Sequence, residues 1–154
     1  MGYSCVIGIV LDLDFMAKFK ENLGSILKHL GESNFRACSN VSTDLIRTSE
    51  FVGFPEGVLV GEIFESLFDN IQGVYRMFDV DEKEISDLKE EITTLIEFLI
   101  REFPFSSNEA KATFYEKIVG VRYKATQFQV KYFREERKRK KRTYLPEHIE
   151  LAEE

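Results

Sequence analysis

The sequence predicts a mostly α-helical protein, a compact bundle of four to five helices, with one short strand pair at the N-terminus left open as an addition. Three observations carry this prediction. Apolar residues recur at helical spacing through most of the chain. Capping residues, glycines and prolines stand at the ends of those segments. The 154 residues, 44% hydrophobic and 31% charged, have the size and composition of one globular domain.

Residues 82–103 form the clearest predicted helix. Asp81 stands at the N-cap with Glu84 three residues later, a capping-box pattern, and Pro104 ends the segment. Leu95 and Leu99 lie at the centre of its apolar stripe, so we expect both to be buried. The stripe consists of Ile85, Leu88, Ile92, Leu95, Ile96, Leu99, Ile100 and Phe103.

Two earlier segments, residues 15–30 and 58–78, have the same spacing. The first has Asp14 as its predicted N-cap and Gly31 as its predicted C-cap. The second contains two internal glycines, each of which weakens a helix by roughly 1 kcal/mol relative to alanine. Their apolar residues are Phe15, Phe19, Leu23, Ile26, Leu27 and Leu30 in the first, and Val60, Ile63, Phe64, Leu67, Phe68, Ile71, Val74, Tyr75 and Phe78 in the second.

The segments on either side of residues 15–30 are less regular. Residues 31–57 contain Gly, Asn, Ser and Pro, which predicts a loop with one turn of helix near residues 44–47. Residues 3–11 are an apolar run too short for periodicity to decide between a buried strand and a first turn or two of helix.

After Pro104, Ser106 and Glu109 form a second capping-box pattern that predicts a helix to about Val119. Gly120 could kink or break it. Beyond the glycine, residues 121–133 fit a helix, but Phe128, Val130 and Tyr132 also alternate, so a hairpin stays open as the competing prediction. We favour helix because a run of Glu, Arg and Lys follows. The predicted division is a helical bundle over residues 1–133, then a basic helix end and acidic tail over residues 134–154.

The net charge of −6 is unevenly distributed along the chain. Residues 1–116 carry 10 Lys/Arg against 21 Asp/Glu, whereas residues 117–142 carry 11 against 2. The last twelve residues add four Glu and no cation. Such asymmetry indicates a polyanionic or acidic partner for the basic part.

The strongest functional feature is the basic segment, residues 134–142. Dense cations attract phosphate by releasing counterions, and neighbouring aromatic rings can stack on unpaired bases. Binding to an acidic protein surface, a solvated helix end and docking on this chain's own acidic helix at 81–102 are the alternatives. The candidate binding residues are Arg134, Arg137, Lys138, Arg139, Lys140, Lys141 and Arg142, with Tyr132 and Tyr144 as flanking aromatics.

A second feature is Asp12-Leu13-Asp14, directly after an apolar run. Over about ten residues this pattern resembles the first motif of the haloacid-dehalogenase-like phosphatases. The resemblance implies a nucleophilic Asp12, a general acid Asp14, bound magnesium and a later acidic pair, for which Asp79 and Asp81 are the candidates. The family's Thr or Val two places after the second Asp is Met16 here. Because the rest of the chain is predicted helical, we expect Asp12 and Asp14 not to be catalytic.

Few side chains are available for metal or nucleophilic chemistry. The two histidines, His29 and His148, lack metal-ligand spacing, and Cys5 and Cys38 lack a Cys-x-x-Cys partner. No phosphate-binding glycine motif is present. We therefore expect no metal, no cofactor and free thiols. Glu62, Glu65 and Asp69 share a helix face, which we expect to be solvated.

The combined prediction is a non-catalytic helical accessory protein that contacts the backbone of RNA or DNA through its basic segment. An adaptor that binds an acidic protein is the alternative, and a magnesium-dependent phosphohydrolase using Asp12 and Asp14 is third. No apolar run approaches the roughly 20 residues that span a bilayer, and no basic region precedes the first one, so we expect a cytoplasmic protein with no membrane contact.

Overall fold

The computed structural model describes residues 3–6 and 9–144, with side chains described over residues 13–138. Helices account for most of these residues, which confirms the mostly α-helical prediction. The elements are β1 (Tyr3–Val6), β2 (Ile9–Asp12), α1 (Leu13–Gly31), α2 (Phe35–Val52), α3 (Pro55–Met77), α4 (Glu82–Glu102) and α5 (Asn108–Tyr144). None of the described helices is both long and apolar enough to cross a bilayer.

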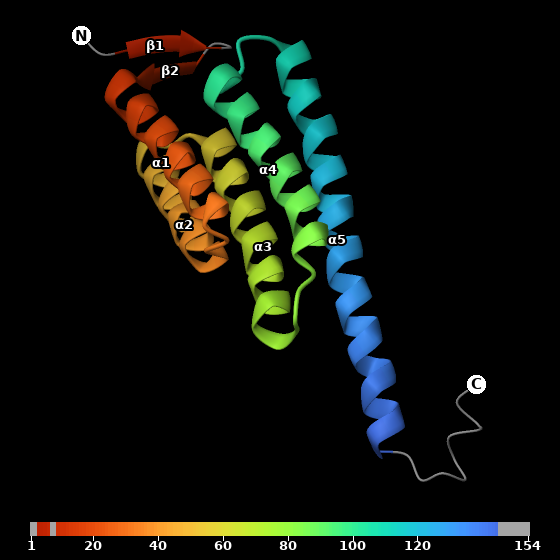
Figure 1. Ribbon diagram of the computed structural model, residues 1–154. Coiled ribbons are helices and arrows are strands. Elements are labelled where there is room, and N and C mark those ends of the chain that lie inside the picture. Colours follow the sequence, from red (N-terminus) through yellow and green to blue (C-terminus); the bar gives the residue numbers. More distant parts are fainter. Residues whose placement is uncertain (1–2, 7–8, 145–154) are drawn as a thin grey trace.

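Successive helices run in opposite directions along one bundle (Figure 1). α2 packs against both α1 and α3, α4 packs against α1, and α5 lies against α4 and α3. At the end of the bundle where α1 begins, β1 and β2 form a two-stranded antiparallel sheet with Tyr3 opposite Asp12.

Phenylalanines fill the centre of this core. Phe19 stacks on Phe103 with 4.9 Å between ring centroids, and Phe54 and Phe105 pack on Phe103 at 5.6 and 5.2 Å. All four rings are at most 2% exposed. These rings come from α1, from the α2–α3 turn and from the α4–α5 connection, and they meet at one point in the core. The abundance of Phe in the sequence therefore serves core packing.

The predicted helix 82–103 is confirmed as α4, and its interior residues Leu95 and Leu99 are 1% and 0% exposed. The Asp81 carboxylate accepts a hydrogen bond from the Lys83 N–H at 3.0 Å, as expected of an N-cap. α1 likewise covers the predicted segment 15–30, and α3 covers the predicted segment 58–78 except for Phe78, which is its C-cap.

The prediction of a loop over residues 31–57 is wrong, because residues 35–52 form the 18-residue helix α2. Asn34 caps it by accepting a hydrogen bond from the Ala37 N–H at 3.2 Å. Ser42 is buried, and its hydroxyl donates to the carbonyl of Cys38 at 2.8 Å. Because its hydroxyl bonds to the backbone of its own helix, the small side chain of Ser42 can lie where α2 packs closely on another helix. Serine, which is typical of loops, here takes part in helix packing.

The predicted N-cap and C-cap of α1 are both wrong. α1 begins at Leu13, so Asp14 lies in its first turn and not at the N-cap. At the other end Gly31 is still helical, and Ser33 adopts the left-handed conformation (φ 57°). The Ser33 N–H donates to Leu30 O and the Asn34 N–H to His29 O, the two bonds of a Schellman C-cap.

Residues 108–144 form the single helix α5, so the hairpin over 121–133 is wrong and Gly120 does not break the helix. The cap differs by one residue from the prediction: the Ser107 hydroxyl, not that of Ser106, accepts a hydrogen bond from the Ala110 N–H at 3.1 Å. α5 therefore continues unbroken from the bundle into the basic segment.

Candidate nucleic-acid interface

One face of α5 anchors it to the bundle. Its buried side chains recur at helical spacing: Phe114, Ile118, Val121, Ala125, Phe128 and Tyr132. Tyr132 is the last of these side chains, and beyond it the helix projects past the end of the bundle (Figure 1). The point at which α5 leaves the bundle is thus set by the contacts of Tyr132 and its neighbours.

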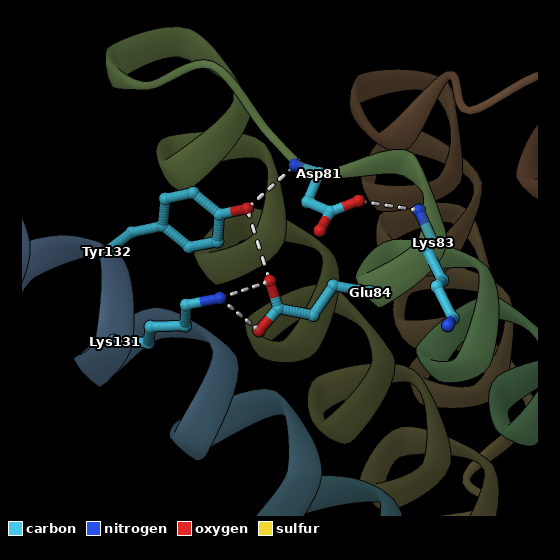
Figure 2. A network of polar contacts seen from close by, with 5 residues as sticks. All are labelled: Asp81, Lys83, Glu84, Lys131 and Tyr132. Atoms are coloured by element: carbon cyan, nitrogen blue, oxygen red, sulfur yellow. Dashed lines mark hydrogen bonds and ion pairs between the residues drawn. The ribbon is translucent and has the colours of Figure 1, made fainter.

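A network of polar contacts ties Tyr132 to the start of α4 (Figure 2). The Tyr132 hydroxyl accepts a hydrogen bond from the Asp81 N–H at 2.7 Å and lies 3.4 Å from Oε2 of Glu84. In an ordinary capping box Glu84 itself would accept from the Asp81 N–H. Here the tyrosine hydroxyl takes that position, so the cap of α4 depends on a side chain of α5.

Lys131 completes the network. Its ammonium donates to both carboxylate oxygens of Glu84, at 3.0 and 2.8 Å. The hydrogen bond with Glu84 raises the pKa of Lys131 above its usual value. Because Glu84 neutralises this lysine, Lys131 contributes little of the positive charge near the end of α5.

The Tyr132 ring is 6% exposed and packs against Phe78 and Phe128 at 5.8 and 5.1 Å between centroids. The expectation that Tyr132 stacks on a base is therefore corrected, since both its ring and its hydroxyl are engaged inside the protein. Phe133, which follows, is 37% exposed and meets Phe78 edge-on at 5.2 Å.

The basic segment begins directly after these contacts. Arg134, Arg137 and Lys138 are exposed, and they form no ion pair within the part of the chain whose side chains are described. One alternative was that the basic segment docks on the chain's own helix 81–102. The structure does not show this docking for Arg134, Arg137 and Lys138, because this part of α5 extends away from α4 (Figure 1). The backbone stays helical through residues 139–144, while the side chains of Arg139, Lys140, Lys141, Arg142 and Tyr144 lie outside the described set.

The side of the bundle next to α5 has the opposite charge. A groove of about 610 Å³ lies between α4 and α5 and is lined by Asp87, Glu90, Glu91 and Glu116 together with two lysines. One of these, Lys124, pairs with Glu91 at 2.9 Å. The acidic side chains of the groove disfavour contact of a polyanion with this side of α5.

The structure separates the residues that the phosphatase resemblance groups together. Asp12 ends β2 at one end of the bundle, whereas Asp81 caps α4 at the other end (Figure 1). The sheet formed by the described strands is two-stranded and antiparallel, unlike the α/β sheet that the resemblance implies. Asp81 has a structural role as an N-cap.

Other candidate side chains also have structural roles. Asp69 accepts a hydrogen bond from the Ser39 hydroxyl at 2.5 Å, and Glu65 accepts one from Thr43, so this face of α3 holds α2 and is only partly solvated. The Cys38 thiol is buried and donates to the carbonyl of Ile26; burial raises its pKa to about 12. Among residues 13–138 no group of three potential metal ligands is found.

Comparisons with protein-family models, with curated proteins and with solved structures each return no match.

Proposed function

We propose that this chain is a non-catalytic accessory protein of the cytoplasm that contacts the phosphate backbone of RNA or DNA through its basic segment, residues 134–142. The observation that carries the proposal is the projection of α5 past the bundle with Arg134, Arg137 and Lys138 exposed. Cations on a free helix end can approach a polyanion that the acidic body would repel.

The contact would be independent of sequence. Six consecutive cations, residues 137–142, point in all directions around a helix with 3.6 residues per turn. Such an arrangement follows phosphates and has no fixed face for reading base edges in a groove. The aromatic contribution is smaller than the sequence suggested, because Tyr132 is buried.

The salt dependence of binding tests the proposal. If six cations each neutralise one phosphate, the logarithm of the binding constant falls against the logarithm of salt with a slope of about −4 to −5. Replacing Lys138, Lys140 and Lys141 by Gln should flatten this slope by roughly 2–3 units and weaken binding to all sequences about equally. Titrations of labelled RNA and DNA at low and moderate salt measure both effects.

A charge-matched control separates the basic segment from net charge. Replacing Lys18, Lys28 and Lys83 by Gln removes the same charge from exposed positions on α1 and α4. We expect this variant to keep the wild-type slope. Equal losses in the two triple variants, or no binding at low salt, would refute the proposal.

The second candidate function is an adaptor that grips an acidic protein. Exposed apolar side chains next to the cations favour it, since Val130 is 44% and Phe133 37% exposed. It predicts salt-sensitive capture of an acidic protein, with no measurable affinity for nucleic acid at physiological ionic strength. The same titrations therefore discriminate between the two functions.

A further inference from the structure

One exposed aromatic ring, that of Phe133, lies directly before the basic segment. Its side chain is 37% exposed, and the other exposed aromatic rings among residues 13–138 are those of Phe51, Tyr115 and Tyr123. Phe78 meets the Phe133 ring edge-on, with 5.2 Å between the ring centroids and 86° between the ring planes. An edge-on contact covers at most one face of a ring, so Phe78 holds Phe133 in place and leaves a face of it uncovered.

Phe133 shares one side of α5 with cations of the basic segment. Positions 133, 137 and 140 are spaced i, i+4 and i+7, which places them within about 60° of one another around the helix and about 10 Å along it. Arg137 is exposed and forms no ion pair within the part of the chain whose side chains are described. The ring and the unpaired charge therefore lie one turn of helix apart on the same side.

Toward the bundle, lysines of α5 are neutralised. Lys124 pairs with Glu91 at 2.9 Å, and Lys131 pairs with Glu84 at 2.8 Å. Phe133 thus lies where the acid-paired lysines of α5 end and the exposed, unpaired cations begin. A polyanion bound to those cations passes beside this ring.

We propose that Phe133 is the stacking platform of a single-stranded nucleic-acid site, with one unpaired base on its ring and the adjoining phosphates on Arg134 and Arg137. This inference rests on the proposed function and names the form of nucleic acid that the basic segment binds. Aromatic rings beside a cationic track are the usual means of holding single strands without reading their sequence. A base in a duplex must first be unpaired and unstacked before it can reach such a ring, which costs free energy. The chain should therefore bind a single strand more tightly than a duplex.

Charge and exposure together favour this occupant over an apolar protein surface. Arg134, Arg137 and Lys138 are exposed around Phe133. An apolar surface laid on the ring would remove neighbouring cations from water without giving them a partner. A nucleotide supplies a flat base for the ring and a negative charge for the cations in one ligand. Because Phe78 already fixes the ring, little side-chain entropy is lost on stacking.

The affinities of the full chain for a single-stranded oligonucleotide and for the duplex of equal length test the proposal. Phe133→Leu keeps an apolar side chain against Phe78 but removes the flat ring. We expect it to weaken single-strand binding by roughly fivefold or more and to leave duplex binding unchanged. Phe133→Tyr, which keeps a flat ring, should bind as the wild type does. Tyr123→Leu is the matched control, since Tyr123 is 65% exposed on the same helix but lies about 15 Å before Phe133.

A fluorescent base reports the stacking contact itself. In a single strand that carries 2-aminopurine, stacking on an aromatic ring quenches the emission of that base. At saturating protein and low salt, the wild type and Phe133→Tyr should quench this emission more strongly than Phe133→Leu does. Circular dichroism confirms that each variant is folded.

The outcomes separate this site from the proposed function. A single-strand affinity that is unchanged in Phe133→Leu, or that falls equally in Phe133→Tyr or in Tyr123→Leu, would overturn the stacking site. Equal affinity of the wild type for single strand and duplex would overturn it too, while salt-dependent binding to both would still support the phosphate contact. Absence of binding to either form at low salt would overturn the phosphate contact and the stacking site together.

Discussion

Replacing Gly61 by Ala tests how closely α2 and α3 approach. A Cβ atom at Gly61 would lie 2.6 Å from Cγ1 of Ile46, 3.0 Å from its backbone nitrogen and 3.1 Å from the carbonyl oxygen of Ser42. Two of these three atoms belong to the backbone of α2 and cannot rotate away. The substitution therefore forces the two helices apart along a packed interface.

The expected cost is the difference of two terms. Overpacking a dense interface costs typically 1–3 kcal/mol. Replacing a helical Gly by Ala gains about 1 kcal/mol, because less backbone entropy is lost on folding. The net destabilisation is then roughly 0–2 kcal/mol, and the two backbone contacts place it toward the upper end. A Cβ at Gly73, in the same helix, would have no atom within 4 Å apart from its chain neighbours and the backbone of its own turns, so Gly73→Ala should stabilise by about 1 kcal/mol.

Urea unfolding followed by circular dichroism measures both effects. With a slope of about 1–3 kcal/mol per molar urea, the midpoint should rise by roughly 0.3–1 M in Gly73→Ala and should fall in Gly61→Ala. If Gly61→Ala raises the midpoint as Gly73→Ala does, α2 and α3 are not in this close contact. The packing assigned to the serine-rich face of α2 would then be wrong.

Three further predictions concern the core, the α4–α5 network and the buried thiol. Leu95→Ala should lower the free energy of unfolding in urea by roughly 2–5 kcal/mol, through lost burial and a residual cavity. A loss as small as that of a surface substitution would contradict the burial of Leu95. Tyr132→Phe should cost about 1–2 kcal/mol, because the Asp81 N–H loses its acceptor, whereas Tyr115→Phe, at a partly exposed site on the same helix, should be near neutral. Since the folded pKa of Cys38 is raised to about 12 from 9.0, its stabilisation is complete below pH 9 and is lost as pH rises toward 12. Cys38→Ala should flatten that alkaline loss of about 1.4 kcal/mol per pH unit, and an unchanged slope would contradict the burial.

Helices with local signals at both ends could be predicted from the sequence. α4 has a capping aspartate, an uninterrupted apolar stripe and a following proline, and all three act within one segment. The continuity of α5 through Gly120 is harder to predict, because an internal glycine weakens a helix but does not by itself determine whether the helix breaks there. Packing of residues on both sides of Gly120, Ile118 and Val121, decides it here.

The sequence does not predict α2 because this helix depends on tertiary contacts and not on local sequence signals. Ser39, Ser42 and Ser49 are buried, yet serine in a sequence is typical of loops and caps. Ser42 and Ser49 lie where α2 approaches α3 closely, because Gly57 of α3 faces Ser49 and Gly61 faces the Ser42 carbonyl, and neither glycine has a side chain that would hold the backbones apart. That complementarity joins segments on different helices, and no local window of sequence contains it.

The candidate site likewise has a part that the sequence predicts and a part that it does not. The cations of residues 134–142 are adjacent in sequence and were found directly. The sequence allows Tyr132 two incompatible roles, as an apolar residue of the helix predicted over residues 121–133 and as a ring that stacks on a base, and its burial selects the first. Its hydrogen bond with the Asp81 N–H joins residues 51 apart, so the sequence could not have revealed that it caps α4.

α5 carries these roles on different parts of one helix. Its inward face packs on the bundle, Lys124 and Lys131 pair with acidic residues of α4, and its last turns carry the cations of the basic segment. Because a helix of 37 residues is about 55 Å long, Lys124, which pairs with Glu91 at the acidic groove, and Lys138, in the middle of the basic segment, are separated by roughly 21 Å along the helix. That distance exceeds the screening length of about 8 Å at physiological salt. Lys124→Gln, which removes a cation at the acidic groove, should thus leave the salt slope of polyanion binding unchanged, whereas Lys138→Gln should flatten it by about 0.7–0.9.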